Sequence, residues 1–479
     1  MRSDRIVALI IAVALFMENM DSTVIATSLP AIAADIGASP LALKLALTSY
    51  LLSLAIFIPA SGWAADRYGA RTVFRAAIAV FMIGSIGCAI SGSLTDFVIA
   101  RIVQGMGGAM MTPVGRIIMV RSTPKRDLVG AMAWVTTPAL VGPVVGPPVG
   151  GFITTFASWH WIFLINIPIG LAGILMASRY IPDLRAEKHE PFDTLGMVLA
   201  GLGIAGLAFG LSVLGLNFLP WTVVAGLIAA GAMFTAAYLV HARRTPAPAL
   251  DLTLLRLPTF RASMTGGFLF RLGVGSIPFL LPLMLQAGFG MTPFQSGLIT
   301  FGAAAGALTM KMAAATILKR FGFRTILVFN ALISSAFLAA CAAFTEATPV
   351  TLMIAVLVIG GFFRSLEFTC INTIAYAEVD NARIGRATAL VSVGQQLSLS
   401  AGVAVGALAV HLTILARGRD VDGPLQALDF PPAFLIVAAI STMSVLAFIR
   451  LPADAGAELA NRTPNPAETA PEATDVRAN

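Results

Sequence analysis

The chain has 479 residues, of which 57% are hydrophobic and only 11% charged, and its mean hydropathy is +0.87. A soluble globular protein carries about 25% charged residues, so this composition excludes one. The charge of +7 does not indicate a nucleic-acid-binding protein, because the basic residues stand in short clusters between apolar stretches. Glycines and prolines interrupt those stretches, whereas barrel strands would show ~10-residue alternation. The sequence therefore predicts an all-α polytopic membrane protein.

Apolar stretches of about 20 residues, the length that crosses ~30 Å of hydrocarbon, recur along the chain. The first follows Arg2 and Arg5. Because Glu18 and Asp21 interrupt it before any cleavage site, we interpret it as a span and not as a signal peptide. The pattern predicts fourteen transmembrane helices, near residues 6–33, 43–64, 74–93, 97–120, 129–153, 161–180, 194–215, 220–241, 262–285, 294–317, 325–344, 349–376, 387–413 and 431–449.

Most of the 31 Lys and Arg residues lie in alternate loops and near the two chain ends. The opposite loops contain only Arg417 and Arg419, with Lys44 at the edge of a span. Positively charged loops resist translocation. We therefore expect a multi-pass protein of the bacterial cytoplasmic (inner) membrane with both termini in the cytoplasm.

Two loops of the chain resemble each other. The stretch from Asp66 to Thr72 follows the second predicted span, the stretch from Lys319 to Thr325 follows the tenth, and both contain Arg, an aromatic residue, Gly, Arg and Thr in register. We therefore expect two related six-helix bundles, residues 1–190 and 246–451, with residues 191–245 as an inserted pair of spans. Residues 452–479, rich in Ala, Pro, Glu and Thr, are expected to form a disordered cytoplasmic tail.

The first of these loops places a carboxylate beside guanidinium groups at a tight cytoplasmic turn. Such a carboxylate can pair with an arginine or a helix N-terminus and separate when the bundles rock, which predicts a cytoplasmic latch. An ordinary positively charged loop would explain the arginines but not the spaced glycines and the acid. The second copy has Lys319 in place of Asp66, so its latch should be weaker or absent. The predicted latch residues are Gly62, Asp66, Arg67, Gly69 and Arg71.

This loop resembles the signature of the major facilitator superfamily, and further stretches resemble the superfamily's drug:proton antiporters with fourteen spans, the multidrug exporters. The stretch from Met20 to Ile25 resembles their first-span motif, although Ala26 and Thr27 replace the usual Asn and Val. The stretch Trp159–Gly170 resembles their sixth span, with His160 where Arg is commoner. The fourth-span and fifth-span motifs match at Arg101, Gln104, Gly105, Gly107 and Gly108, and at Gly142, Gly146, Pro147, Gly150 and Gly151.

The resemblance implies a major facilitator fold of two six-helix bundles plus two inserted helices. It implies a proton-coupled antiporter that exports small amphipathic compounds or drugs by alternating access; uptake by symport is less favoured because the antiporter motif is present. The implied partners are protons, a small-molecule substrate and the lipid bilayer, and a periplasmic adaptor is left open. No cofactor or metal site is expected, since the four histidines lack any metal-ligand spacing.

Two acids lie deep in the first predicted span. Glu18 and Asp21 are ~18–23 Å from its cytoplasmic end and three residues apart on one helical face. We expect them to face protein or water and, with Arg101, to form a proton-coupling site. The alternative is a permanent ion pair with Arg101 or Arg116, and it is stronger for Glu18, which the family motif does not require.

The fifth predicted span concentrates glycines and prolines within ten positions. Small residues allow close helix approach and prolines kink a helix, so the run predicts a bending interface beside a cavity. Static tight packing is the alternative. The antiporter motif comprises Gly142, Pro143, Gly146, Pro147, Gly150 and Gly151.

Polar residues in other spans are expected to line a substrate cavity, with hydrogen bonding between helices as the alternative. Arg364 and Glu367, three residues apart, can neutralise each other, and Lys311 can snorkel to the interface. The predicted spans contain five cations against three acids. This excess makes an exporter of organic anions or carboxylate-bearing metabolites the alternative function. The predicted cavity residues are Gln104, Arg271, Lys311, Arg364, Glu367 and Gln395.

A membrane-embedded enzyme is the rival from another functional class. It would need a nucleophile with a base, but the sequence has neither a G-x-S-x-G nor an H-E-x-x-H motif. The sequence has no Walker loop, so we do not expect ATP to supply the driving force. We therefore do not expect an enzyme.

Overall fold

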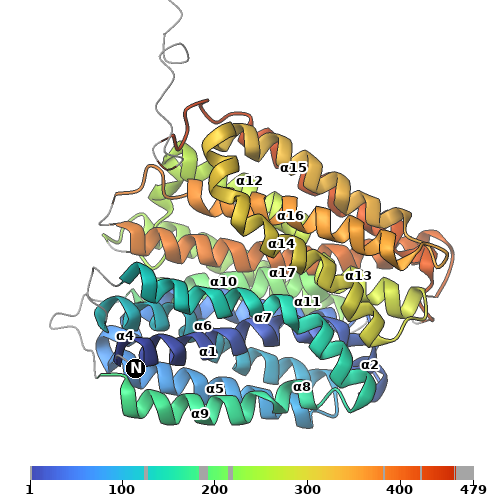
Figure 1. The fold of residues 1–479 in the computed structure, drawn as a ribbon, viewed down its shortest axis with the longest axis horizontal. Coiled ribbons are helices and arrows are strands. Elements are labelled where there is room, and N and C mark those ends of the chain that lie inside the picture. Colours follow the sequence, from blue (N-terminus) through green and yellow to red (C-terminus); the bar gives the residue numbers. More distant parts are fainter. Residues whose placement is uncertain are drawn as a thin grey trace, which may run out of the picture.

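A computed structural model describes residues 3–122, 128–182, 193–213, 219–246, 248–380, 383–420, 423–457 and 459. The regular elements in these residues are helices, without strands, in agreement with the all-α prediction. The helices form two bundles that lie side by side, the first coloured blue to teal and the second yellow to orange (Figure 1).

The first bundle contains the predicted spans one to six. Pro59 interrupts the second span, because proline has no backbone N–H to donate; the helix passes through a short 3-10 turn and continues, so that Lys44–Tyr68 forms one span. Gly69, with φ of 89°, then turns the chain directly into the next helix. The elements are α1 (Ser3–Val24), η1 (Ile25–Thr27), α2 (Leu29–Asp35), α3 (Lys44–Phe57), η2 (Ile58–Ala60), α4 (Ser61–Tyr68), α5 (Ala70–Ile90), α6 (Leu94–Ser122), α7 (Leu128–Phe156), α8 (Trp161–Leu164) and α9 (Asn166–Tyr180).

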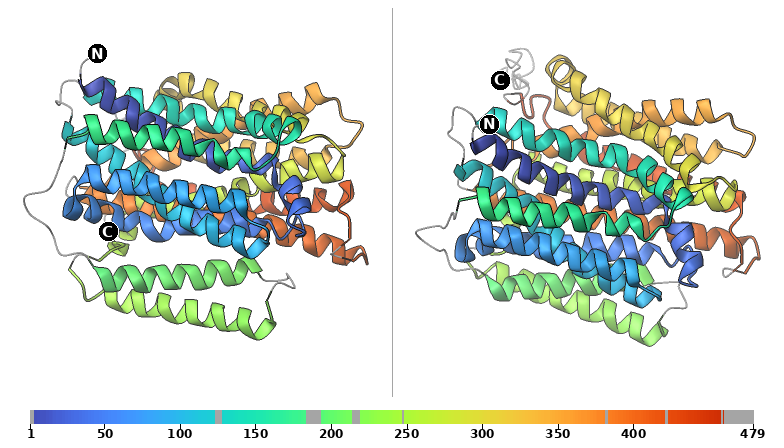
Figure 2. Two further views of the ribbon diagram at one scale, coloured as in Figure 1. Left: turned by 90° about the horizontal axis from the view of Figure 1, so that it is seen from below. Right: turned by 60° about the horizontal axis from the view of Figure 1, so that its bottom comes forward.

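The predicted inserted spans form an antiparallel pair, α10 (Thr194–Val213) and α11 (Trp221–Ala242). The pair lies along one edge of the molecule (Figure 2). Asp193 fastens it to the linker that follows: its carboxylate is hydrogen-bonded to His241 Nε2 at 2.7 Å and to the N–H groups of Gly196 and Ala249 at 2.8 and 3.1 Å. The start of α10 and the end of α11 are thus joined to the entry of the second bundle.

The second bundle contains the predicted spans nine to fourteen. Thr292 and Gln295 form a capping box at the start of α14: Thr292 Oγ1 accepts from the Gln295 N–H, and Gln295 Oε1 accepts from the Thr292 N–H. Gly322, with φ of 74°, forms the turn equivalent to that at Gly69. The elements are η3 (Leu252–Arg256), α12 (Pro258–Gly275), α13 (Ile277–Leu283), a π-helical turn η4 (Met284–Gly288), α14 (Pro293–Phe321), α15 (Phe323–Ala340), η5 (Cys341–Ala343), α16 (Val350–Ile374), α17 (Ile384–Ala416), η7 (Ala427–Asp429), α18 (Pro431–Thr442) and α19 (Val445–Phe448).

The same helix pairs pack together in both bundles. α1 packs on α7 as α12 packs on α17, α3 on α6 as α14 on α16, and α5 on α9 as α15 on α18. Between the bundles, α7 packs against α14 and α3 against α17, and α10 also packs against α3 and α17. We call the end of the molecule with the turns at Gly69 and Gly322 the basic end, and the other end the opposite end.

Twelve helical spans in the described residues are long and apolar enough to cross a membrane. The two remaining predicted spans, near 129–153 and 294–317, correspond to α7 and α14, each of 29 residues. The count of fourteen and the domain boundaries stay predictions, and residues 460–479 of the predicted tail lie outside the described residues. The first residues after 451 contact the second bundle, since Ala455 packs against its apolar residues.

Candidate functional site

A fully buried carboxylate, that of Asp21 on α1, lies inside the first bundle. Its Oδ2 is 2.7 Å from Nη1 of Arg101 on α6, and its Oδ1 accepts hydrogen bonds from Gln104 Nε2 and Asn166 Nδ2, both at 2.9 Å. We call these four residues the acid cluster. Arg101 is as fully buried as Asp21. A lone buried charge costs several kcal/mol, so the pairing is what permits both charges here.

Arg101 also reaches beyond the acid cluster. Its Nε donates to the carbonyl oxygen of Ala46 at 3.3 Å, and its guanidinium carbon lies 4.2 Å from the centroid of the Tyr50 ring. Its Nη2 and the Tyr50 hydroxyl are buried without a hydrogen-bond partner in the part of the chain that the structure describes. Both side chains line the cavity described below. Arg101 therefore belongs to the acid cluster and to the cavity wall at once.

Glu18, one turn before Asp21, has a different environment. Its Oε2 accepts a hydrogen bond from Thr112 Oγ1 at 2.8 Å. Between described residues, no ion pair joins Glu18 to Arg101 or Arg116, whereas Asp21 does pair with Arg101. The ion-pair alternative thus fits the geometry of Asp21 and not that of Glu18, and proton exchange at either acid stays a prediction.

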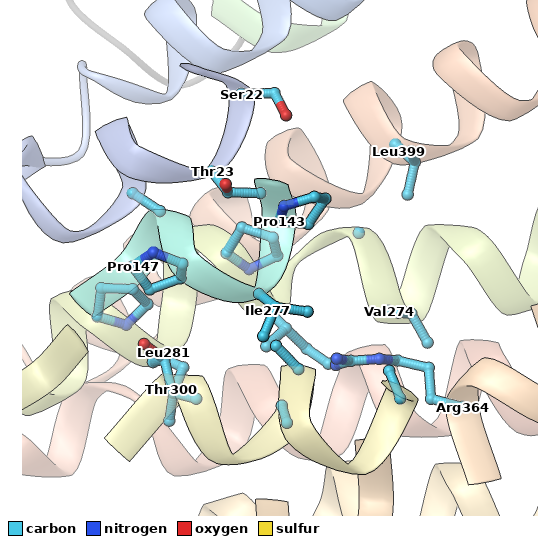
Figure 3. A pocket seen from close by; sticks show the side chains of 18 of the residues that line it. Ser22, Thr23, Pro143, Pro147, Val274, Ile277, Leu281, Thr300, Arg364 and Leu399 are labelled. Atoms are coloured by element: carbon cyan, nitrogen blue, oxygen red, sulfur yellow. The ribbon is translucent and has the colours of Figure 1, made fainter. Parts of the chain in front are cut away.

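A cavity of about 470 Å³ lies between the two bundles. Helices α1, α3, α6 and α7 form one wall, and α12, α13, α14, α16 and α17 form the other. Its lining is mostly apolar; Figure 3 shows Pro143 and Pro147 of α7 beside Ile277 and Leu281 of α13, with Arg364 of α16 further along. The predicted site residues that line it are Arg101, Pro143, Pro147, Lys311 and Arg364.

The other four residues predicted for the cavity are not among those that line it in this state, and their part in substrate binding stays a prediction. Gln104 belongs to the acid cluster, and Gln395 lies on α17 outside the lining. Arg271 Nη2 donates to Asn372 Oδ1 at 2.6 Å, and Glu367 Oε2 accepts from Asn330 Nδ2 at 2.9 Å. Bonds between neighbouring helices, the alternative considered for such residues, occupy three of these four side chains.

Arg364 and Glu367 do not neutralise each other, although they lie three apart on α16. No ion pair joins them, because Glu367 is directed to Asn330 on α15 while Arg364 lines the cavity. Lys311 also lines the cavity, and its Nζ donates to Thr369 Oγ1 on α16 at 3.0 Å. Two cations of the second bundle thus face the cavity without an acidic partner among the described residues.

The glycines of the antiporter motif face neighbouring backbones. A side chain at Gly150 would collide with the carbonyl oxygen of Val24 on α1, and one at Gly151 with that of Pro293 at the start of α14. Gly142 and Gly146 also face α1. The motif glycines of α7 therefore pack tightly in this state, against α1 within the first bundle and against α14 of the second. Bending of α7 at the motif stays a prediction.

The two bundles are joined at the opposite end. Gln286 Nε2 donates to the carbonyl oxygen of Thr27 at 2.9 Å, and the Phe294 N–H donates to Thr155 Oγ1 at 3.1 Å. At Gly297 an added side chain would collide with the backbone of Pro147. These contacts hold α14 and η4 of the second bundle against the first bundle at that end.

The predicted latch forms an ion pair at the basic end. Asp66 Oδ1 lies 2.6 Å from Nη2 of Arg121, the residue near the end of α6, and both side chains are about one-third exposed, 37% and 34%. Arg71 Nη1 donates to the carbonyl oxygen of Ile181 at 3.4 Å. Gly62 stands in open space, and Arg67 is exposed. The pair joins α4 to α6 within one bundle, and its opening during transport stays a prediction.

Sequence reasoning missed several residues of these sites. Arg121 follows the fourth predicted span in a cluster of basic residues, and no sequence feature marks it as the partner of Asp66. Tyr50 and Thr112 lie in spans with no motif. Asn166 belongs to the stretch that resembles the sixth-span motif, so that resemblance offered a signal for it, although not for its contact with Asp21.

Two bundles of membrane-spanning helices, a cavity between them and a buried acid at its edge define a membrane transport protein. The chain belongs to the major facilitator superfamily, whose family model matches residues 11–194 and 263–477. It is a multi-pass membrane transporter, and the alternative of a membrane-embedded enzyme is excluded.

Known proteins resemble the chain over almost its full length. It is 36% identical over 451 residues to "Putative multidrug resistance protein MdtD" of Salmonella heidelberg (strain SL476), covering 93% of this chain and 94% of that protein. It is 37% identical to the protein of the same name from Serratia proteamaculans (strain 568), with 93% of each chain covered. Among solved structures, a D-xylose-proton symporter superposes with a TM-score of 0.66 at 16% identity, covering 94% of this chain and 98% of that one. This last likeness concerns the fold alone.

Proposed function

We propose that the protein is a proton-coupled antiporter that exports small amphipathic compounds, drugs among them, from the cytoplasm across a bacterial cytoplasmic membrane. The relatives named for multidrug resistance support export of drugs. In this proposal the basic end and both termini face the cytoplasm, since positively charged loops stay on that side.

The position of Arg101 carries the proposal. One guanidinium pairs with Asp21 and also lines the cavity. A proton on Asp21 removes the negative charge that holds Arg101, so the guanidinium becomes free to interact with the cavity's contents. Two ligands are coupled when each changes the contacts available to the other. Proton binding at Asp21 and substrate binding in the cavity meet that condition through Arg101.

Alternating access then follows from the contacts between the bundles. We infer that the Gln286–Thr27 and Phe294–Thr155 hydrogen bonds help to keep the opposite end closed, so that the cavity of this state is loaded from the cytoplasm. Release to the outside requires those contacts to separate along α7 and α14. The glycines of the antiporter motif allow the backbones to come this close when the outer side is shut.

The test uses everted membrane vesicles, in which the proton gradient is acid inside. Addition of a transported compound from a panel of cationic, neutral and anionic dyes should release protons through the wild type. Asp21→Asn should release none, because an amide cannot carry a proton. Asp380→Asn, at an exposed surface ion pair, is the matched control and should behave as wild type. Full transport by Asp21→Asn, or by wild type after an ionophore collapses the pH gradient, would refute the proposal.

A further inference from the structure

The charges on the cavity wall do not balance. Arg101, Lys311 and Arg364 line the cavity, and its lining among the described residues includes neither Asp nor Glu. The cavity is otherwise built largely from aliphatic side chains and prolines. A cation facing such surroundings is costly unless an anion or water compensates it. Lys311 is exposed and Arg364 is half-buried, so the need for a counter-charge is greater at Arg364.

None of the three acids in the predicted spans pairs with Lys311 or Arg364. Asp21 is held by Arg101, Glu18 accepts from Thr112, and Glu367 accepts from Asn330. Arg101 is therefore compensated, whereas Lys311 donates only to the neutral hydroxyl of Thr369 and Arg364 has no ion pair among described residues. Two positive charges of the second bundle remain at the cavity without a protein counter-charge.

Two further polar groups at the cavity lack partners. Arg101 Nη2 and the Tyr50 hydroxyl, both buried on the wall opposite Lys311 and Arg364, have no hydrogen-bond partner in the described chain. Buried donors are normally satisfied, and an unsatisfied one costs about 1–3 kcal/mol. Both atoms are inaccessible from the cavity in this state, so a ligand would reach them only after this part of the wall moves.

Lys311 and Arg364 stand on helices that pack against each other, α14 and α16. Figure 3 shows Arg364 on the cavity wall across from Pro143 and Pro147 of α7. The cavity thus has two cations without an acidic partner on α14 and α16, and apolar surface on α7 and α13. Its volume of about 470 Å³ is that of a small-molecule site.

We propose that this cavity binds an amphipathic organic anion, with its carboxylate on Arg364 and Lys311 and its apolar body against α7 and α13. The inference rests on the proposed export function and names its substrate class. A cationic drug meets two like charges and no acid in this site, so it is the disfavoured ligand. A neutral compound gains the apolar contacts only.

The experiment compares three probes on the purified full-length protein in a neutral detergent. Naphthoate, naphthamide and naphthylmethylammonium share one ring system and differ in charge, and equilibrium dialysis measures the Kd of each. We expect wild type to bind naphthoate about tenfold more tightly than naphthamide, the effect of a charge-assisted hydrogen bond. Naphthylmethylammonium should bind most weakly.

Substitutions test which residues produce the preference for naphthoate over naphthamide. Arg364→Gln and Lys311→Gln should each remove most of the naphthoate preference and leave the Kd of naphthamide unchanged. Lys319→Gln removes a positive charge from the same helix outside the cavity and should keep the preference. Arg364→Lys keeps the charge and should keep most of it. The comparison of the three probes on wild type decides the inference even where a glutamine variant fails to fold.

Three results would overturn the inference: wild type binds naphthoate no more tightly than naphthamide, both glutamine variants keep the preference, or Lys319→Gln loses it equally. A lipid headgroup could supply the same anionic chemistry, so the titration is repeated in nanodiscs of phosphatidylcholine with and without phosphatidylglycerol. Loss of naphthoate binding only with phosphatidylglycerol would assign the cations to lipid and also overturn it. None of these measurements needs a proton gradient. The vesicle test can therefore fail while the anion preference stands, and the reverse.

Discussion

Arg71 and Arg324 make the same contact in the two bundles. Each stands two residues after the glycine of its turn, and each donates to the carbonyl oxygen at the end of its bundle's last span, Ile181 for Arg71 and Ile449 for Arg324. Arginine is well suited to the end of a helix, where carbonyl oxygens lack partners. The repeat therefore preserves a structural contact at the basic end, while the ion pair of Asp66 belongs to the first copy.

Asp66→Asn should slow transport more than Lys319→Ala, because only the first copy has a carboxylate to pair with Arg121. The pair is partly exposed, so its loss should lower stability by no more than about 1 kcal/mol. Substrate binding should be largely retained. Transport rates and equilibrium binding on the same purified variants separate the two effects.

Arg121→Gln should reproduce the Asp66→Asn defect, since it removes the other partner. Equal defects from Asp66→Asn and Lys319→Ala would argue against a latch confined to the first copy.

Asp21→Asn should lower the free energy of unfolding by about 2 kcal/mol, because Arg101 then keeps a buried charge without its counter-charge. The cavity beside Arg101 limits the loss, so the protein should still fold. In the double variant Asp21→Asn, Arg101→Gln part of the stability should return, since no unpaired charge remains. Melting temperatures in detergent measure this cycle, and strictly additive losses would show that the two residues do not interact.

Gly150→Ala should destabilise the protein and reduce transport, because the new methyl group meets the carbonyl oxygen of Val24. Overpacking of this kind costs roughly 1–3 kcal/mol. Gly226→Ala on α11 is the matched control, since that glycine has open space around it. Thermal melting and the vesicle assay on both variants check the prediction, and similar behaviour of the two would contradict it.

Asp193 should make the attachment of the inserted helices sensitive to acid. Burial opposes ionisation of this carboxyl, but its hydrogen bonds from His241 and from the N–H groups of Gly196 and Ala249 outweigh burial and lower its pKa. A carboxylate with a lower pKa in the folded state contributes stability above its unfolded pKa, and loses it as the pH falls through the folded value. Asp193→Asn should therefore lower the melting temperature at pH ~7 and matter progressively less below pH ~4. A constant difference between the variant and wild type across that range would contradict the assignment.

The sequence predicts the position of a motif residue along its own helix better than it predicts the contacts of that residue with other helices. The family and the helical class follow from composition and motifs, and the depth of Asp21 follows from counting along one span. A site shared with Arg101, 80 residues away, was expected, but the contacts of Asp21 with Gln104 and Asn166 were not, because the spacing within a span does not show which helices pack together.

Glu367 illustrates the physical reason. Its spacing from Arg364 is right for a pair on one helix face. The partner it has in the structure, Asn330, comes within reach only because α15 packs on α16. Arg121 is similar, since it meets Asp66 only after α4 and α6 lie side by side. Such contacts depend on tertiary packing, which a pattern along one segment does not encode.

Helix α10 makes the two flanks of the molecule different where the bundles meet the bilayer. Because α10 packs against both α3 and α17, it covers one of the two lines along which the bundles meet. Along the other line α7 and α14 pack directly against each other, and the exposed side chain of Phe152 on α7 contacts Phe294 on α14. The inserted pair therefore shields the contact between the bundles from lipid on the α3–α17 flank, whereas on the α7–α14 flank the two bundles themselves meet the membrane.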